Sequence, residues 1–199
     1  MIRDFCGRQQ PVVHARFGVQ RGAPPPPPHK GPAPPVPPPA KTPAAPPPFV
    51  RRPADAEYVP LPHGGGFSLL ADASDTGGAL GANALTLGEG ADGARPHFHA
   101  LSHELFYVAE GTAEFLLGGE RSTVAEGGLV VVPPRVPHAF GAARGSTARL
   151  LAVLTPGVER FGYFRALGRI QHGLESFDGL RSEQDRYDVH FLPTPRPWR

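Results

Sequence analysis

Short apolar runs recur along the chain from residue 57 onward, separated by clusters of Gly, Pro and Asp. Their length and their β-branched content predict strands. The runs lie at residues 57–61, 67–70, 80–87, 104–111, 112–119, 121–128, 129–134 and 148–154. Glycines at 111, 118–119 and 127–128 are expected to form hairpin turns. Residues 129–132 read LVVV, which predicts a strand covered on both faces, and hence two packed sheets or a barrel.

The pattern changes after Pro156. Apolar residues recur every three positions from 158 to 167, a spacing that predicts one short helix packed on the β unit. From 187 to 191, apolar and polar residues alternate, which predicts a final strand or an extended strap. We therefore expect an all-β domain that carries one short C-terminal helix.

The first 48 residues differ in composition from the rest. Of the 25 residues at 24–48, 15 are Pro, and none is aromatic or acidic. A segment that has so little to bury stays extended, so residues 1–48 are expected to form a disordered, proline-rich, basic leader. One folded domain is then expected at 49–199. A transit peptide and a polyproline ligand for an SH3-like partner are alternative interpretations of the leader.

Charge separates at the same boundary. Residues 1–48 carry a net charge of +5, which leaves −3 for the rest of a chain whose net charge is +2. The domain at 49–199 has no Lys and no basic stripe, so no nucleic-acid partner is expected.

Cys6 is the only cysteine, which points away from an oxidising compartment and makes the cytoplasm the expected location. No apolar run approaches the roughly 20 residues that cross a bilayer, so no membrane partner is expected.

The candidate chemistry lies in a cluster of histidines. His97 and His99 are two residues apart, so on a strand their side chains point to the same face. Glu104 returns to that face only if the chain turns or bulges within residues 100–103. His138 belongs to a later strand and can enter from across a barrel. Three imidazoles and one carboxylate suit one divalent transition metal ion per chain (Ni, Co, Mn, Fe, Cu or Zn), and they do not suit Ca or Mg.

These residues resemble the two sequence motifs of the cupin superfamily. The first motif is matched by His97, His99, Glu104 and Gly111, and the second by Gly127, Pro133 and His138. Departures from the family pattern fall on turn-forming positions that do not bind metal, namely Ala91, Arg135 and Ala142. The resemblance implies a cupin-type double-stranded β-helix, a jelly-roll barrel, with His97, His99, Glu104 and His138 as the metal ligands.

Within that superfamily the chain is similar to single-domain bacterial quercetinases, in the segments 103–111, 155–168 and 186–198. The resemblance implies a metal-dependent dioxygenase whose partners are O2 and a flavonol-like or other enolisable aromatic substrate. Glu104 is then both a ligand and the catalytic base that removes the substrate proton, which makes the substrate electron-rich enough to attack O2. The resemblance also implies a homodimer that pairs through edge strands.

The substrate pocket is expected beside Glu104. Phe106 and Val108 share its parity along the strand, and Phe140 is a further candidate for an apolar wall. Arg95 is a weaker candidate for steering an anionic substrate. The histidines at 63, 103, 172 and 190 are expected to be exposed or hydrogen-bonded. Two other functions suit the same site: a non-oxidative cyclase or isomerase of a polyketide-like phenol, and a non-catalytic ligand-binding or regulatory cupin.

Overall fold

The computed structural model describes residues 46–193 and residue 198. The strands are β1 (Glu57–Pro60), β2 (Gly66–Ala71), β3 (Gly81–Leu87), β4 (Asp92–Phe98), β5 (His103–Leu117), β6 (Glu120–Ala125), β7 (Leu129–Val132), β8 (His138–Ala142), β9 (Ala148–Thr155) and β10 (His190–Phe191). The α-helices are α1 (Phe161–Gln171), α2 (Asp178–Ser182) and α3 (Gln184–Tyr187), and single 3-10 turns span Pro53–Asp55, Pro62–Gly64 and Ala73–Thr76. The expected leader lies outside the described residues over 1–45.

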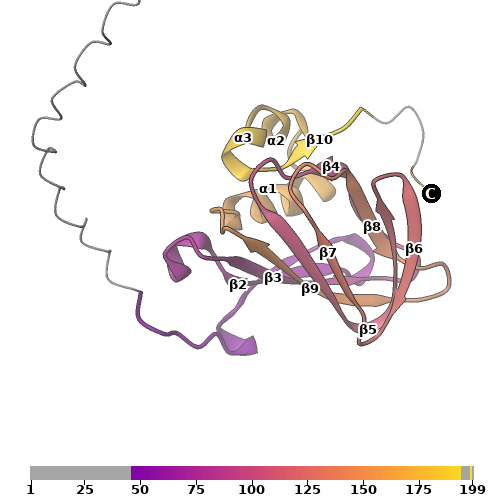
Figure 1. Cartoon of the computed structure of the whole chain (residues 1–199), viewed down its shortest axis with the longest axis horizontal. Coiled ribbons are helices and arrows are strands. Elements are labelled where there is room, and N and C mark those ends of the chain that lie inside the picture. Colours follow the sequence, from indigo (N-terminus) through magenta and orange to yellow (C-terminus); the bar gives the residue numbers. More distant parts are fainter. Residues whose placement is uncertain (1–45, 194–197, 199) are drawn as a thin grey trace, which may run out of the picture. The chain divides into compact units, whose positions relative to one another are not determined.

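The strands form two antiparallel layers that share the long strand β5 (Figure 1). In one layer the order is β1-β2-β3-β9-β5-β7, and in the other it is β6-β5-β8-β4-β10. The sheet curls into a half-barrel, and the helices gather at one end of it. Phe106, Phe115 and Leu150 lie at its centre and are fully buried. This arrangement confirms the all-β expectation.

The turn predicted at Gly111 is wrong, because β5 runs through this residue without a break. Its first half pairs with β7 and β9, and its second half with β6 and β8. A register shift between Val108 and Glu110 and a left-handed φ of +72° at Gly111 bend the strand from one layer into the other. A Cβ atom at Gly111 would lie 2.0 Å from the carbonyl oxygen of Thr147. The turns predicted at 118–119 and 127–128 are confirmed.

The double coverage predicted for residues 129–132 is also wrong. Val130 and Val132 face the core, whereas Leu129 is 58% and Val131 53% exposed. The cause is the position of β7, which pairs with β5 along one edge and has one face turned outward.

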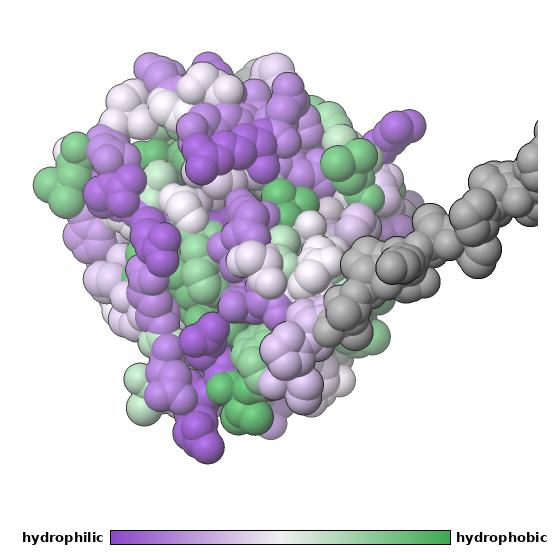
Figure 2. All heavy atoms as spheres, turned by 90° about the vertical axis from the view of Figure 1, so that its left-hand side faces the viewer, coloured by the Kyte–Doolittle hydropathy of each residue, from purple (hydrophilic) through white to green (hydrophobic). Residues whose placement is uncertain are grey.

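The expected homodimer stays a prediction. On the side of the molecule in Figure 2, hydrophobic residues lie in small groups between hydrophilic ones.

The predicted C-terminal helix is confirmed as α1, which starts at Phe161. Phe164 packs on Phe67 with 4.8 Å between ring centroids, and a Cβ on Gly168 would collide with Val59, so α1 lies close against β1. The strand or strap predicted from the alternation at 187–191 is confirmed only for the two residues of β10. Residues 178–187 form the short helices α2 and α3, and β10 pairs with β4 so that Phe191 lies opposite His97. Within the described residues, no helix is long and apolar enough to cross a membrane.

Candidate metal centre and adjoining cavity

The structure brings together all four residues that the sequence analysis assigned to a metal. His97 lies at the end of β4, His99 just after it, Glu104 at the start of β5 and His138 at the start of β8. All four are buried, and one potential ligand atom from each lies within 4.8 Å of those of the others. The register pairs His97 with His138 directly, because β4 and β8 are neighbouring antiparallel strands. Both sequence motifs therefore meet at one point in the barrel.

The turn that returns Glu104 to the cluster is held by Asp188. Its carboxylate accepts hydrogen bonds from the backbone N–H groups of Ala100 at 2.6 Å and Ser102 at 3.0 Å, and also from the intervening residue. The Ser102 hydroxyl donates to the carbonyl of Pro156 at 2.8 Å. Asp188 is 2% exposed and adopts a left-handed backbone with φ of +50°. Sequence reasoning missed this residue, because it lies far along the chain and nothing within the segment 186–198 singled it out.

Each imidazole of the cluster is oriented by a backbone carbonyl. Nδ1 of His97 donates to the carbonyl of Arg95 at 2.8 Å, and Nδ1 of His138 donates to that of Val136 at 3.0 Å. Nδ1 of His99 likewise donates to the carbonyl of Asp188. These bonds place the proton of each neutral ring on Nδ1, so each Nε2 has a lone pair to offer.

Three atoms of the cluster that have lone pairs lie so close together that positive charge must lie between them. Nε2 of His99 and Nε2 of His138 each lie 2.9 Å from Oε2 of Glu104. Neutral rings with the proton on Nδ1 offer only lone pairs to a carboxylate oxygen, which has lone pairs itself. A metal ion or protons must therefore neutralise this contact. The donor set fits a first-row transition metal, which combines imidazole and carboxylate ligands.

Burial sets the charge state of two members. Burial, reinforced by His138 and His99, lowers the pKa of His97 well below its ordinary value of 6.5, so its ring is neutral. Burial alone would raise the pKa of Glu104. When Nε2 of His99 and Nε2 of His138 are protonated, however, the charge of His99 and hydrogen bonds from both rings hold that pKa well below 4.5. The cluster therefore contains a carboxylate anion and at least one neutral imidazole above mildly acidic pH.

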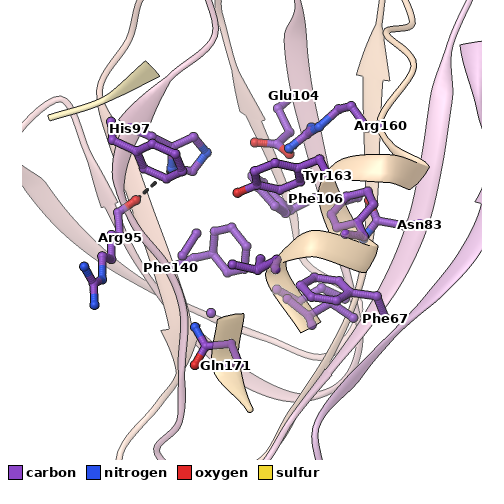
Figure 3. A pocket seen from close by; sticks show the side chains of 18 of the residues that line it. Phe67, Asn83, Arg95, His97, Glu104, Phe106, Phe140, Arg160, Tyr163 and Gln171 are labelled. Carbon is purple, nitrogen blue, oxygen red and sulfur yellow. Dashed lines mark hydrogen bonds and ion pairs between the residues drawn. The ribbon is translucent and has the colours of Figure 1, made fainter. Parts of the chain in front are cut away.

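A cavity of about 220 Å³ opens beside the cluster and reaches His97 and Glu104 (Figure 3). Phe106 and Phe140 line it, with Phe67 and other apolar side chains around them. Val108, the third residue expected to line the pocket, lies elsewhere. Its side chain is fully buried in the hydrophobic core and outside the cavity lining, because it lies two residues further along β5 than Phe106.

Comparison with known families identifies the domain. Residues 84–154, which include the whole His/Glu cluster, match the family model described as a cupin domain. The matched segment, residues 84–154, is a cupin domain. The predicted cupin fold is thus confirmed, and the metal motifs lie within the matched segment. No curated protein matches the chain.

Solved structures of cupin-like proteins resemble it weakly. A variant of Streptomyces PAC13 with uridine is 16% identical, covers 56% of this chain and 84% of its own, and has a TM-score of 0.46. The polyketide cyclase RemF from Streptomyces resistomycificus is 25% identical, with coverages of 54% and 80% and a TM-score of 0.45. KdgF from Halomonas sp. is 24% identical, with coverages of 50% and 87% and a TM-score of 0.43.

Three polar residues of the cavity escaped the sequence analysis. Arg160 immediately precedes α1, Tyr163 belongs to α1, and Asn83 lies on β3. Burial raises the pKa of Tyr163 to about 12, so its hydroxyl stays protonated, and Figure 3 shows it pointing into the cavity of the cupin domain. The helical period of 158–167 could not reveal Arg160 or Tyr163, because such a period marks the inward face of a helix and does not distinguish a packed core from a cavity.

The four other histidines among the described residues do not belong to the cluster. His63 and His103 are exposed, and the ring of His172 donates to the carbonyl of Gly168 at 2.8 Å. The ring of His190 stacks on Phe98 with 4.9 Å between centroids. Arg95 is exposed at the cavity, and its guanidinium lies 5.5 Å from the centre of the Phe177 ring.

Proposed function

We propose that this cupin is a metal-dependent dioxygenase, similar to quercetinases, that oxidatively cleaves a flavonol-like or other enolisable aromatic substrate. One observation carries the proposal: three imidazoles and a carboxylate converge on one point that opens into a cavity walled by aromatic rings. A purely structural histidine cluster would have no need of a cavity beside it. The partners of the reaction are a small aromatic molecule and O2.

His97, His99, Glu104 and His138 are the residues that would hold one divalent transition metal ion per chain. When bound there, the ion supplies Lewis acidity and a fixed point that orients the substrate oxygen beside O2. The backbone carbonyls bonded to each Nδ1 keep the three rings in place before any ligand arrives. The fold therefore preorganises the site.

Glu104 is the residue that takes the substrate proton. Its Oε2 is engaged by His99 and His138, whereas its Oε1 is on the side of Arg160, whose Nη1 lies 3.7 Å away. Oε1 is thus the oxygen available to a hydroxyl in the cavity. With its pKa held low, the carboxylate is ionised at neutral pH, so Oε1 is not already protonated when the substrate arrives.

The aromatic walls bind the substrate ring and exclude water. Phe106 and Phe140 pack against each other with 4.7 Å between ring centroids. Phe106 lies two residues after Glu104 on β5, and Phe140 lies two residues after His138 on β8, so both rings are next to the His/Glu cluster. Flat apolar walls around a few convergent polar groups are typical of pockets for small aromatic ligands. Exclusion of water also strengthens the electrostatic interactions of Glu104 with substrate.

The decisive comparison is between the full-length wild-type chain and Glu104→Gln, with metal content and flavonol-dependent O2 uptake measured on the same samples. The amide keeps the size and one oxygen donor of the carboxylate, so we expect at least half of the metal to remain, while O2 uptake falls about a hundredfold or more. His103→Gln, the exposed neighbour, is the matched control and keeps both.

Unchanged O2 uptake in Glu104→Gln contradicts the assigned base. Turnover of an enolisable phenol that persists under strict anaerobiosis contradicts the dioxygenase, and it favours the cyclase or isomerase alternative. A metal-loaded chain that binds phenols and turns none of them over favours the ligand-binding alternative.

A further inference from the structure

Arg160 is a buried cation with unused hydrogen-bond donors. Its side chain is 9% exposed, and its Nε and Nη1 atoms have no hydrogen-bond partner within the described part of the chain. Both atoms belong to a residue that lines the cavity, and Figure 3 shows the side chain extending towards Glu104. Burying hydrogen-bond donors without acceptors is costly, so proteins rarely leave such donors in place without a partner.

No nearby carboxylate accepts a hydrogen bond from the Arg160 guanidinium among the described residues. Oε1 of Glu104 lies 3.7 Å from Nη1, beyond hydrogen-bond distance. The carboxylate of Asp72 accepts the backbone N–H of Arg160 at 2.6 Å and that of Phe161 at 3.1 Å, so it holds the start of α1. Oε1 of Glu159 accepts the backbone N–H of Ser74 at 2.6 Å.

Two aromatic rings fix the guanidinium. Its central carbon lies 5.2 Å from the ring centroid of Tyr163 and 5.2 Å from that of Phe164. Cation–π contacts orient the charge, but a ring face does not satisfy N–H donors as an oxygen does. Among the described residues that line the cavity, Arg95 and Arg160 are cationic, and Glu104 is the one carboxylate. The cavity therefore has an excess of positive charge before any metal is counted.

We propose that Arg160 binds an anionic oxygen of the substrate, a carboxylate or an ionised hydroxyl, within the cavity. A ligand anion supplies the acceptor that Nε and Nη1 lack, and charge-assisted hydrogen bonds of this kind are among the strongest in proteins. The cavity volume of about 220 Å³ lies below the roughly 300–1,000 Å³ of drug-sized pockets. The part of the substrate that this cavity encloses is accordingly small, an aromatic ring that carries the anionic oxygen. This inference rests on the proposed function, because it assigns a charge to the same substrate.

The test uses pairs of probes that match in shape and differ in charge, titrated by calorimetry into the full-length chain at pH 8.5. Benzoate is compared with benzamide, and 4-nitrophenol, ionised at this pH, with nitrobenzene. We expect the anion of at least one pair to bind about tenfold more tightly or better, and Arg160→Gln to abolish that preference. The pair that responds distinguishes a carboxylate from an ionised hydroxyl. Arg165→Gln, an exposed arginine of α1, is the matched control and keeps the preference.

Equal affinities within both probe pairs overturn the inference, and this wild-type comparison decides even where Arg160→Gln does not fold. A preference that survives Arg160→Gln, or that disappears in Arg95→Gln instead, also overturns it, because the anion then binds to a metal or at the cavity mouth. Anion binding through Arg160 in a chain that holds no metal leaves this inference standing and contradicts the proposed dioxygenase.

Discussion

His99 and Asp188, 89 residues apart in the sequence, are joined by a hydrogen bond from the imidazole Nδ1 to the backbone carbonyl. The same Asp188 holds the turn between His99 and Glu104 through its carboxylate. One residue of the C-terminal segment thus orients a candidate ligand and also positions the segment that carries the next one. The geometry of the candidate metal centre therefore depends on the segment around Asp188.

Removal of the Asp188 carboxylate is expected to destabilise the domain and loosen the centre. Asp188→Gly tolerates the left-handed backbone but leaves buried N–H groups at residues 100–102 without their acceptor. We expect a loss of about 3 kcal/mol in unfolding free energy and a metal affinity lowered about 10–100-fold. Asp188→Asn, which keeps one acceptor oxygen, loses less of both. Equal urea midpoints for wild type and Asp188→Gly would refute the assigned role.

The low pKa of His97 predicts a pH dependence of stability in the metal-free chain. Burial holds this pKa below the 6.5 of the unfolded state, so at pH values between the two the unfolded chain binds the extra proton. The contribution of neutral His97 to the free energy of unfolding is fully present above pH 6.5. As the pH drops from 6.5 towards the pKa of the folded state, the free energy of unfolding falls by about 1.4 kcal/mol per pH unit for one proton. Urea unfolding of chelator-treated protein from pH 7.5 to 5.5 measures this slope, and His97→Asn flattens it. Identical slopes in both proteins would rule out His97 as the cause.

The bend of β5 predicts unequal costs for two glycine substitutions. Gly111 and Gly145 both have φ of +72°, so alanine meets the same backbone strain at each, about 1 kcal/mol. A Cβ at Gly145 has nothing within 4 Å, whereas one at Gly111 meets the carbonyl of Thr147. Gly111→Ala should therefore lose at least twice as much unfolding free energy as Gly145→Ala. Similar losses in urea titrations would mean that β5 bends without needing Gly111.

The sequence predicted what depends on local pattern. The parity of His97 and His99, and the turn required before Glu104, follow from strand geometry, and the structure shows both. The period of residues 158–167 marked α1 for the same reason. Local signals also misled at Gly111, where a glycine that bends a continuous strand has the same sequence signature as one that ends it.

What the sequence could not predict depends on contacts between distant segments. Asp188 lies in a stretch whose alternation suggested a strand, and its role appears only when β10 pairs with β4. Arg160 looks like any charged residue before a helix until α1 folds over the barrel and buries it. The outward face of Val131 follows from the edge position of β7, which no window of sequence contains.

The metal content of the full-length chain tests the central claim most directly. Elemental analysis of the wild type is compared with His97→Ala/His99→Ala, and with a control that replaces the exposed His63 and His103 by alanine. We predict about one transition-metal ion per wild-type chain, kept in the control and lost in the cluster variant. A wild type that contains no metal, and takes none up from Mn, Fe, Co, Ni, Cu or Zn, would contradict the account.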